Sequence, residues 1–347
     1  MAVTGEPGEP PSDTNRVDAS IATGDRGALV AGSDTPPTIG IDLGGTKIEG
    51  IVLTADGRTL VKRRIPSPRE NYRATIEAIA GLVGWLRAAA GSQMPGPARV
   101  GIAIPGSVAP STGRVQNANS TWLNGQPLQS DLAAHLGTPP RLANDANCFA
   151  LSEAEDGAAA GAGSVFGGIP GTGRGGGNVV GGRPVDGPRR GGGGRGPHPP
   201  PWPRDGETPG PQCWCGNSGC LETWISGPAL AADHRRVTGA DVSAEDIVAS
   251  ASQASDAPGA LAARLTLSRH ASRLARGLAS IVNVIDPEVI VLGGGLSNLA
   301  HLYDEVPELA QRFIFAADRR IDLRPPRFGD ASGARGAARL WRTHREV

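Results

Sequence analysis

The chain has 347 residues, and its 34 basic and 34 acidic side chains leave no formal net charge. This length allows two domains with cores of their own, and the balanced charge gives no electrostatic reason to bind nucleic acid or a membrane surface. No apolar run is long enough to span a membrane, and the N-terminus lacks the basic region and apolar stretch of a secretory signal. We therefore expect a cytoplasmic protein.

Glycine, proline and small polar residues dominate positions 1–37, which contain few large apolar side chains. Such a segment cannot bury a core, so we predict a disordered N-terminal extension. Strands that alternate with helices follow it and predict an α/β protein. We expect a first lobe over residues 38–147, a second lobe over residues 148–331, and a C-terminal helix within 332–347 that folds back onto the first lobe.

The first ordered segment, Thr38–Leu53, reads TIGIDLGGTKIEGIVL and predicts a strand, a tight glycine turn and a second strand. Gly44 and Gly45 have no Cβ, so the backbone can bend sharply and its amides can approach a large anion. Asp42 stands at the mouth of the turn, where a carboxylate can hold a metal-bound phosphate. An ordinary hairpin with a DxGG turn is the alternative.

The rest of the first lobe alternates strands with one long helix. The predicted elements are the strands Thr59–Arg64, Arg99–Ile104 and Arg141–Asn144 and the helix Glu70–Ala90. A polar loop, Asn117–Gln126, follows the second of these strands and reads NANSTWLNGQ. Such a loop commonly binds a polar ligand, although Asx turns alone also explain this composition.

A predicted helix begins at Asp145 and runs to about Gly157. As the first residue of a helix, Asp145 suits an N-cap. Its functional interpretation is a general base, because a sugar hydroxyl is a weak nucleophile until a positioned carboxylate accepts its proton. The helix N-terminus would help to keep this carboxylate ionised.

Two more glycine segments resemble the first. The predicted hairpin Val165–Val180 contains the turn Gly167–Gly173 (GGIPGTG), and Gly293–Gly295 follows the predicted buried strand Val289–Leu292. Two glycine-and-hydroxyl turns more than a hundred residues apart suggest two similar halves that face one nucleotide. A strand that ends in glycines also marks the nucleotide crevice of open α/β sheets.

Between these segments, Asp186–Pro203 reads DGPRRGGGGRGPHPPPWP and shows no periodicity. Either a natural flexible loop or a stretch of GC-rich gene read out of frame explains this composition.

Three of the four cysteines, Cys213, Cys215 and Cys220, fall within eight residues. The spacing CxCx4C can wrap one tetrahedral zinc ion if a fourth ligand lies near, and His198 is the nearest candidate upstream. We expect a structural zinc that fixes the irregular loop to a helix that begins near Glu222.

The last predicted helices are Pro258–Ile285, Leu302–Ala316 and Ser332–Trp341. Helical periodicity places one apolar stripe on the buried face of the longest helix. This stripe contains Leu261, Leu265, Ala271, Leu274, Leu278, Ile281 and Ile285.

With these segments assembled, the chain resembles the ROK family of sugar kinases in the actin and hexokinase superfamily. The matching pieces are IGIDLGGTKIEG, GIAIPGSV, NANSTWLNGQPL, LANDANCFALSEAEDGA, GTGRGGG, CWCGNSGCLETWISGP, NVIDPEVIVLGGGLSN and FGDASGARGAA. The resemblance implies a two-lobed actin-like (ribonuclease H-like) fold with a ligand cleft between the lobes. Among subgroups, the polar loop and the Asp145 helix most resemble bacterial fructokinases.

The resemblance also implies roles at matching positions, with Asp145 as the catalytic base. ATP phosphates and Mg²⁺ would be handled by Asp42, Gly44, Gly45, Thr46, Lys47, Gly171, Thr172 and Gly173. Adenosine would lie against Gly293, Gly294 and Gly295. Sugar hydroxyls would be bound by Asn117, Asn144, Asp145 and Glu222. Zinc would be bound by Cys213, Cys215 and Cys220, with His198 as the candidate fourth ligand.

One departure concerns the family's GExGH segment, whose Glu binds sugar and whose His touches zinc and sugar. Alignment on the downstream Pro-Trp-Pro places Gly194 at the Glu position and Pro197 at the His position, whereas alignment on His198 places Arg195 at the Glu position. Neither alignment restores the carboxylate. A sugar-binding protein with weak activity is therefore one alternative to an active kinase.

The sequence thus predicts an ATP-dependent hexose kinase that acts on a 6-hydroxyl, with fructose as the first substrate and glucose, mannose or N-acetylglucosamine as alternatives. Its partners would be the sugar and ATP, and we expect a homodimer. A ROK-type repressor is not expected, because residues 1–37 show no helix-turn-helix pattern.

Overall fold

Two five-stranded sheets with helices on their faces make up the part of the chain that the computed structural model describes, residues 35–169, 175–191, 198–254 and 257–342. Positions 1–34 of the predicted extension lie outside this range. Contacts group Thr35–Val347 into one unit, so the lobe boundary predicted after residue 147 stays a prediction.

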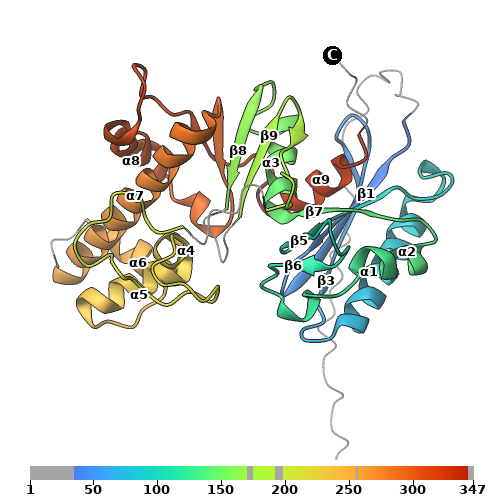
Figure 1. Ribbon diagram of the computed structural model, residues 1–347, viewed down its shortest axis with the longest axis horizontal. Helices are drawn as coiled ribbons and strands as arrows, with labels where there is room; N and C mark the ends of the chain where they lie inside the picture. Colours follow the sequence, from blue (N-terminus) through green and yellow to red (C-terminus); the bar gives the residue numbers. More distant parts are fainter. Residues whose placement is uncertain (1–34, 170–174, 192–197, 255–256, 343–347) are drawn as a thin grey trace, which may run out of the picture. The chain divides into compact units, whose positions relative to one another are not determined.

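The first sheet has the strand order β3-β2-β1-β4-β7 (Figure 1). Its strands are β1 (Thr38–Leu43), β2 (Lys47–Leu53), β3 (Thr59–Pro66), β4 (Val100–Ile104) and β7 (Arg141–Asn144). The strands β1, β2 and β3 are antiparallel neighbours, whereas β1, β4 and β7 are parallel. The predicted strand–turn–strand around the first glycine turn is therefore confirmed.

The second sheet repeats this plan, with the strand order β10-β9-β8-β11-β12. Its strands are β8 (Ser164–Gly168), β9 (Gly176–Val180), β10 (Arg183–Pro184), β11 (Val289–Leu292) and β12 (Leu323–Arg324). Again three strands are antiparallel neighbours and three are parallel. The strand pairs β1–β2 and β8–β9 occupy equivalent places in the two strand orders, which agrees with the two similar halves expected from the sequence.

Nine α-helices lie within the described residues. They are α1 (Tyr72–Ala90), α2 (Leu128–Leu136), α3 (Asp145–Glu155), α4 (Glu222–Ile225), α5 (Gly227–Thr238), α6 (Ala244–Ala251), α7 (Pro258–Ile285), α8 (His301–Ala310) and α9 (Ser332–Arg339). A small ladder joins β5 (Ser107–Val108) to β6 (Val115–Gln116). None of the helices in the described ranges is long and apolar enough to cross a membrane.

Side chains in β1 alternate between two faces of the first sheet. Ile39, Ile41 and Leu43 enter a buried core that α1 also lines. The opposite face belongs to α9, because a Cβ on Gly40 would lie 1.9 Å from the carbonyl oxygen of Ala334. With a period of two residues, Asp42 shares this α9 face with Gly40.

The helices α9 and α3 also pack against each other at backbone distance. A Cβ on Gly336 of α9 would lie 1.7 Å from the carbonyl oxygen of Cys148 on α3, and one on Gly101 of β4 would lie 1.8 Å from that of Ala337. These approaches require glycine. The C-terminal helix therefore folds back onto the first sheet, as predicted, and contacts α3 as well.

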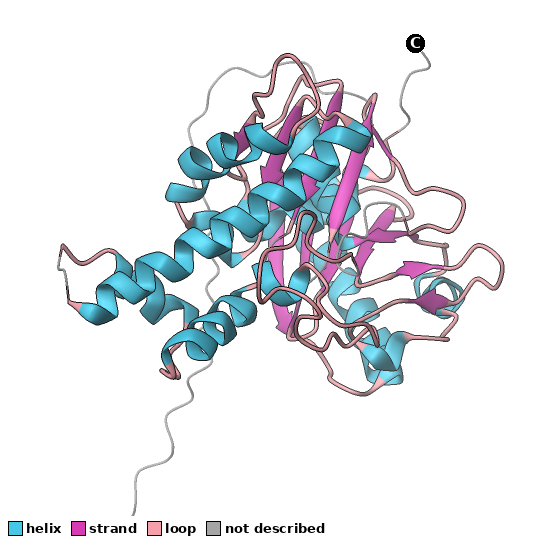
Figure 2. Cartoon of the chain, turned by 60° about the vertical axis from the view of Figure 1, so that its left-hand side comes forward, coloured by secondary structure: helices cyan, strands magenta, loops and turns pink. Residues whose placement is uncertain are grey.

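The second sheet has α3 on one face and α7 with α8 on the other. Val165, Val289 and Val291 join a core with α3, while Phe166 and Ile290 join one with α7 and α8. Figure 2 shows cyan helices packed over the magenta strands.

Three details of the predicted helices were wrong. Leu261 and Leu265 are about half exposed rather than buried, because the first turns of α7 face α5 and α6 through Ala260 and Ala263. The helix predicted to reach Ala316 ends at Ala310 and continues as a 3₁₀ turn, Gln311–Phe313. The last helix ends at Arg339 rather than Trp341. The short helices α2 and α6 were not predicted.

Candidate active site

Asp42 lies at the end of β1 beside the first turn of α9. A Cβ on Gly333 would lie 2.4 Å from Asp42 Oδ2, so only glycine leaves room for this carboxylate. The adjoining turn is closed by the Gly44 amide, which donates to the Lys47 carbonyl at 3.0 Å. Gly45 borders Ser120 of the polar loop, since a Cβ there would lie 3.6 Å from its hydroxyl oxygen. The carboxylate and the glycine turn therefore occur together.

Asp145 begins α3, but its neighbour performs the capping. The side chain of Asn144 is the N-cap and accepts from the Ala146 amide at 3.0 Å. Asp145 Oδ1 accepts from the same amide at 2.8 Å, and the residue is half-buried. The positive end of the helix stabilises the ionised carboxylate, which is the form that accepts a proton.

The two predicted sugar-binding asparagines meet at one backbone turn. Asn144 Nδ2 donates to the Gly106 carbonyl at 2.9 Å. Gly106 also borders the backbone of Asn117, because a Cβ on Gly106 would lie 2.9 Å from the carbonyl carbon of Asn117. Elsewhere in the polar loop, the Asn124 side chain bonds both the amide and the carbonyl of Ala118. Asn124 thus holds the loop, while Asn117 is exposed.

The exit from the second glycine turn rests on the start of α3. Gly171, Thr172 and Gly173 lie outside the described residues. A Cβ on Gly175 would lie 2.5 Å from the Ala146 Cβ and 3.8 Å from Asp145 Oδ1. The chain therefore leaves this turn beside the proposed base.

The third glycine segment contacts α3 one turn further along. A Cβ on Gly293 would lie 2.7 Å from the Phe149 ring, and the Gly293 amide donates to the Gly168 carbonyl at 2.7 Å. Gly294, with φ of 78°, and Gly295 are exposed and turn the chain away from the sheet. Both glycine segments of the second sheet therefore border α3.

Cys148 lies where α3 meets α9, and no role was predicted for it. The thiol is fully buried, and burial together with the negative charges of Asp42, Asp145 and Asp186 raises its pKa well above the ordinary value. Asp42 borders Gly333 in the first turn of α9, and Asp145 begins α3, whose Cys148 carbonyl lies against Gly336 of α9, so the packing of the two helices connects the surroundings of the two carboxylates. Cys148 follows Asp145 by three residues, so the two share a face of the helix. This spacing was the signal in the sequence that could have drawn attention to Cys148.

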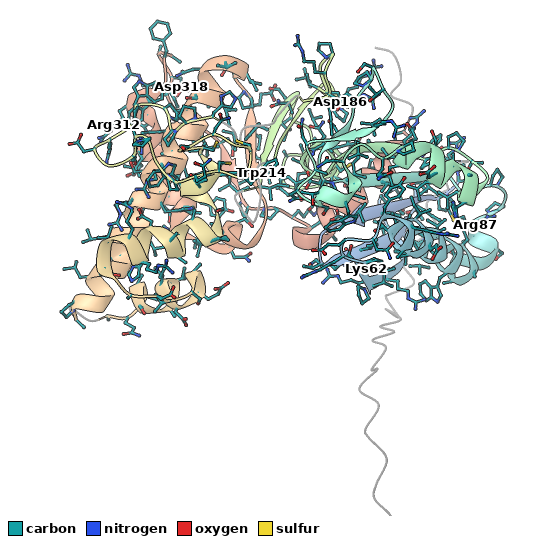
Figure 3. The ribbon with its side chains drawn as sticks, turned by 60° about the horizontal axis from the view of Figure 1, so that its bottom comes forward. Lys62, Arg87, Asp186, Trp214, Arg312 and Asp318 are labelled. Atoms are coloured by element: carbon teal, nitrogen blue, oxygen red, sulfur yellow. The ribbon has the colours of Figure 1, made fainter. Side chains whose placement is uncertain are left out.

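The first residues of the low-complexity stretch Asp186–Pro203 form hydrogen bonds with α3 and with β6. Asn147 Nδ2 donates to Asp186 Oδ1 at 2.7 Å, and Gln116 Nε2 donates to the Arg189 carbonyl at 2.9 Å. Asp186 is labelled in Figure 3. Gly194, Arg195 and Pro197, the positions compared with the GExGH segment, lie outside the described residues.

The three clustered cysteines do converge. Their Sγ atoms lie within 4.8 Å of one another, and those of Cys215 and Cys220 are 3.5 Å apart. Sulfur ligands about 2.3 Å from a tetrahedral zinc ion lie roughly 3.8 Å apart, so the set fits three corners of such a site. Among the described residues, no histidine or carboxylate joins this mutual grouping.

The three thiols do not ionise with equal ease. A hydrogen bond from the Asn217 amide lowers the pKa of Cys215, whereas burial raises the pKa of Cys213 and Cys220. Cys215 is thus the thiol that ionises most readily, and a bound metal would draw protons from the other two.

His198 and Glu222, which were expected near the cysteines, differ in how they approach them. The His198 carbonyl accepts from the Leu221 amide at 2.6 Å, which brings its backbone beside the cysteines, and the residue itself is exposed. Glu222 Oε1 accepts from Cys213 Sγ at 2.9 Å and from the indole of Trp214. The carboxylate predicted to bind sugar therefore faces the thiols.

Buried ion pairs anchor the loop before the cysteines. Arg276 is fully buried and donates to the carbonyls of Pro201 and Trp202 and to Glu207 at 2.7 and 2.8 Å. Arg273 donates to the same carboxylate at 2.9 Å. Burial opposes ionisation of Glu207, but these hydrogen bonds outweigh it and lower its pKa to about 2.

The family model for the ROK family matches residues 38–344. The chain belongs to the ROK family. It is 35% identical over 305 residues to the N-acetyl-D-glucosamine kinase of Yersinia enterocolitica, covering 87% of this chain and 98% of that protein. It is 36% identical over 307 residues to the N-acetyl-D-glucosamine kinase of an Escherichia coli strain, with the same coverage.

Solved structures of ROK proteins share the fold. The ROK hexokinase from Thermus thermophilus superposes with a TM-score of 0.74 at 33% identity, over 87% of this chain and 96% of that one. A ROK family glucokinase from Streptomyces griseus, solved with glucose and AMPPNP, has a TM-score of 0.70 at 27% identity, over 88% and 98%. The predicted family and two-lobed actin-like fold are therefore confirmed.

Proposed function

We propose that this protein is an ATP-dependent hexose kinase that phosphorylates a sugar 6-hydroxyl. The observation that supports the proposal is that Asp42 and Asp145 each lie beside a glycine turn, at the first turns of α9 and α3, and that these two helices pack against each other at Gly336 and Cys148. One carboxylate suits a metal-bound phosphate, and the other suits the removal of a proton from a hydroxyl.

The residues divide into a nucleotide side and a sugar side. Asp42 would hold Mg²⁺, which neutralises phosphate charge, while the backbone amides of the first glycine turn and of Gly171–Gly173 would bind phosphate oxygens. Lys47 and Thr46 would complete this side. Gly293–Gly295 would lie against adenosine.

On the sugar side, Asn144 and Asn117 would bind hydroxyls while Asp145 accepts the proton of the attacking 6-hydroxyl. The bond between the γ-phosphorus and the oxygen that bridges it to the β-phosphate breaks, and a bond from phosphorus to the sugar oxygen forms. Positioning and electrostatics supply most of the rate enhancement in this kind of transfer.

The identity of the sugar is the finer part of the proposal. The polar loop and the Asp145 helix favour fructose. The relatives described above are named as N-acetyl-D-glucosamine kinases, a hexokinase and a glucokinase, which supports N-acetylglucosamine and glucose among the alternatives. We therefore propose a hexose kinase whose substrate is fructose, N-acetylglucosamine, glucose or mannose.

A structural zinc ion at Cys213, Cys215 and Cys220 forms part of the proposal. It would hold the loop that carries Glu222 and would supply no chemistry to phosphoryl transfer. His198 is the proposed fourth ligand, supported by the contact of its backbone with Leu221. The homodimer also stays a prediction.

A second candidate is a sugar-binding relative with weak turnover. The missing GExGH carboxylate and the turn of Glu222 toward Cys213 favour it. The test is ADP release with Mg²⁺–ATP and each of the four hexoses, followed by identification of the product. A sugar 6-phosphate formed at a kcat of about 1 s⁻¹ or more, the usual range for kinases, supports the kinase. Binding without turnover supports the second candidate.

A further inference from the structure

The structure assigns a role to three side chains far from the glycine turns. We propose that Asp156, Arg335 and Arg339, together called the clasp, position the base Asp145 relative to Asp42. The inference rests on the function proposed above for those two carboxylates. The clasp residues touch no proposed ligand, so they are positioning residues.

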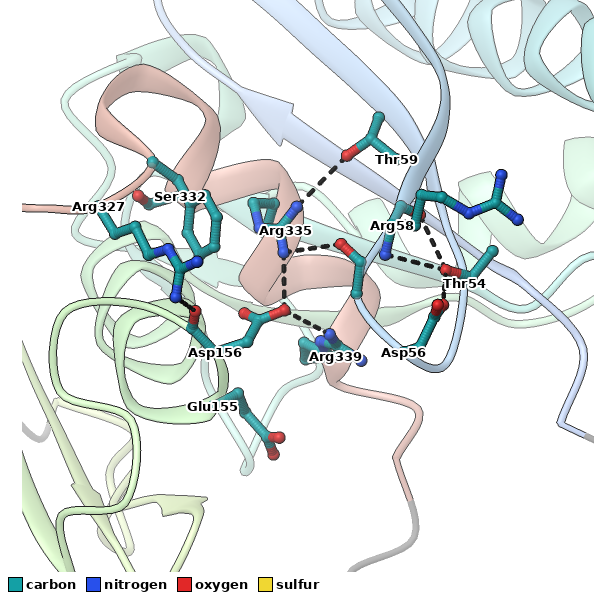
Figure 4. Close-up of polar contacts among 12 residues, drawn as sticks. Thr54, Asp56, Arg58, Thr59, Glu155, Asp156, Arg327, Ser332, Arg335 and Arg339 are labelled. Atoms are coloured by element: carbon teal, nitrogen blue, oxygen red, sulfur yellow. Dashed lines mark hydrogen bonds and ion pairs between the residues drawn. The ribbon is translucent and has the colours of Figure 1, made fainter. Parts of the chain in front are cut away.

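The clasp joins the end of α3 to α9. Asp156 is the C-cap of α3. Its Oδ2 accepts from Arg335 Nη2 at 2.7 Å and from Arg339 Nη2 at 2.7 Å (Figure 4). Both arginine side chains are more than nine-tenths buried, while that of Asp156 is 27% exposed. One carboxylate therefore fixes two guanidinium groups on successive turns of α9.

The same arginines also bind the turn between β2 and β3. Arg335 Nη2 donates to the Gly57 carbonyl at 3.0 Å, and its Nη1 donates to the Thr59 hydroxyl at 3.3 Å. Arg339 Nη1 donates to the Ala55 carbonyl at 3.0 Å. Figure 4 shows this turn, α3 and α9 meeting at the two arginines. The clasp thus ties α3 to the first sheet through α9.

The clasp lies at the end of α3 opposite to Asp145. Asp145 begins α3 and Asp156 follows its last residue, so about 17 Å of helix separates them. In α9, Gly333 borders Asp42 in the first turn, and Arg335 and Arg339 follow it two and six residues later. Each helix therefore carries one side of the proposed site and one side of the clasp.

Between the two ends, the helices have little freedom. The Gly336 backbone meets the Cys148 carbonyl closely enough to exclude a Cβ, so the pair packs tightly in one register. The planar forks of two arginines then fix the orientation at the far end. If the clasp opens, α3 can turn about its contact with Gly336 and change the position of Asp145 relative to Asp42. A misplacement of about 1 Å can lower a rate by 10²-fold.

The test is Asp156→Asn in the full chain, with Glu155→Gln as the matched control. The control removes the neighbouring carboxylate, which pairs with Arg342 beyond the end of α9. We expect the clasp variant to lose about 10- to 100-fold in kcat, with KM for ATP and for sugar changed by less than about threefold. The control should keep kcat within about twofold.

A folded Asp156→Asn protein with the kcat of the parent would overturn the inference. If that variant does not fold, Arg339→Lys decides, because lysine keeps the charge but loses the fork. A lower kcat at unchanged KM in the lysine variant supports the clasp, and a parental kcat shows that the clasp serves stability alone.

Hydrogen exchange of α3 and α9 in the same proteins needs no substrate. It separates failure of the clasp from failure of the proposed function. Faster exchange in the first turns of both helices, in Asp156→Asn but not in Glu155→Gln, is the expected result even if no hexose is phosphorylated. Unchanged exchange there would count against the clasp.

Discussion

The start of α3 and the loop 198–224 contribute to the same proposed site, but different forces hold them. At the start of α3, backbone meets backbone: a Cβ on Gly177 would lie 2.1 Å from the Ala146 carbonyl oxygen, and one on Gly336 would clash with Cys148. In the loop, side chains make the links, through the ion pairs of Glu207 with Arg273 and Arg276 and through three thiols.

Because of this difference, we expect substitutions in the two regions to have different effects, on the reaction at the start of α3 and on folding in the loop. At the start of α3 the fold depends on glycines and helix packing, so a change of one polar side chain there should alter the reaction and leave the structure intact. In the loop the fold depends on charges and on sulfur, and removing one partner of a buried pair leaves the other uncompensated. Substitutions, metal removal and acid should therefore act on loop structure first.

The largest effect is expected from Asp145→Asn. The amide keeps the shape of the side chain and Asn144 still caps the helix, but the variant cannot accept a proton. Turnover should fall by about 10²–10⁴-fold, with thermal stability and ATP affinity unchanged. The measurement is kcat with the best hexose, and the matched control is Asp131→Asn, another acid in the first turn of a helix. Turnover near that of the parent would remove Asp145 from the mechanism.

Cys215→Ser should act on the loop instead. The parent should contain close to one zinc ion per chain, and the variant should lose both metal and thermal stability, because ligand bonds contribute to folding. Metal analysis and melting curves of protein purified without chelator provide the measurement. Cys148→Ser is the control, since this thiol lies away from the cluster and should leave metal content unchanged. Parent protein free of zinc would show that the three thiols do not form the proposed site.

A smaller, pH-dependent effect should come from His270, which links α7 to the loop's first helix. Its ring Nε2 contacts the Ile225 carbonyl at 2.9 Å. Burial, with the positive charges of His301 and Arg273, lowers its pKa from 6.5 to about 4, although the Ile225 contact favours the charged form. The folded state therefore resists protonation that the unfolded chain accepts.

Because the folded pKa is the lower one, this stability is complete above about pH 6.5 and is lost as the pH falls toward 4. The loss should reach about 3 kcal/mol at the acid end. Urea unfolding between pH 7 and pH 5 measures the first part of this loss, about 2 kcal/mol. Glu207, with its pKa near 2, adds its own loss only below about pH 4.5. A His270→Gln variant should show a flatter profile, and an equally steep one would assign the effect to other groups.

Local patterns were enough to predict much of the fold. Alternation in β1 and helical spacing in α1 depend on neighbours in sequence, and the helix that starts at Asp145 follows from its capping residues. Leu261 and Leu265 were predicted as buried but are exposed. Their surroundings depend on α6, and this helix was not predicted.

The parts of the candidate site that lie in sequence motifs could be predicted from the sequence. Asp42, Asn144 and Asp145 lie in recognisable segments, and the structure brings their surroundings together. The clasp and the Glu207 ion pairs join residues 179 and 69 positions apart. No local pattern specifies such partners, because they depend on which elements come to face each other after folding.

The comparison of the two regions leads to one direct measurement, a pair of titrations with Mg²⁺–ATP and with a hexose. The parent should bind ATP in the usual range for a kinase and the sugar weakly, because the residues proposed for phosphate binding remain while the GExGH carboxylate is missing. Gly194→Glu combined with Pro197→His rebuilds that segment. It should raise sugar affinity about ten- to a hundred-fold and leave ATP affinity unchanged. A parent protein that binds fructose, glucose or N-acetylglucosamine as tightly as the rebuilt one would contradict this account.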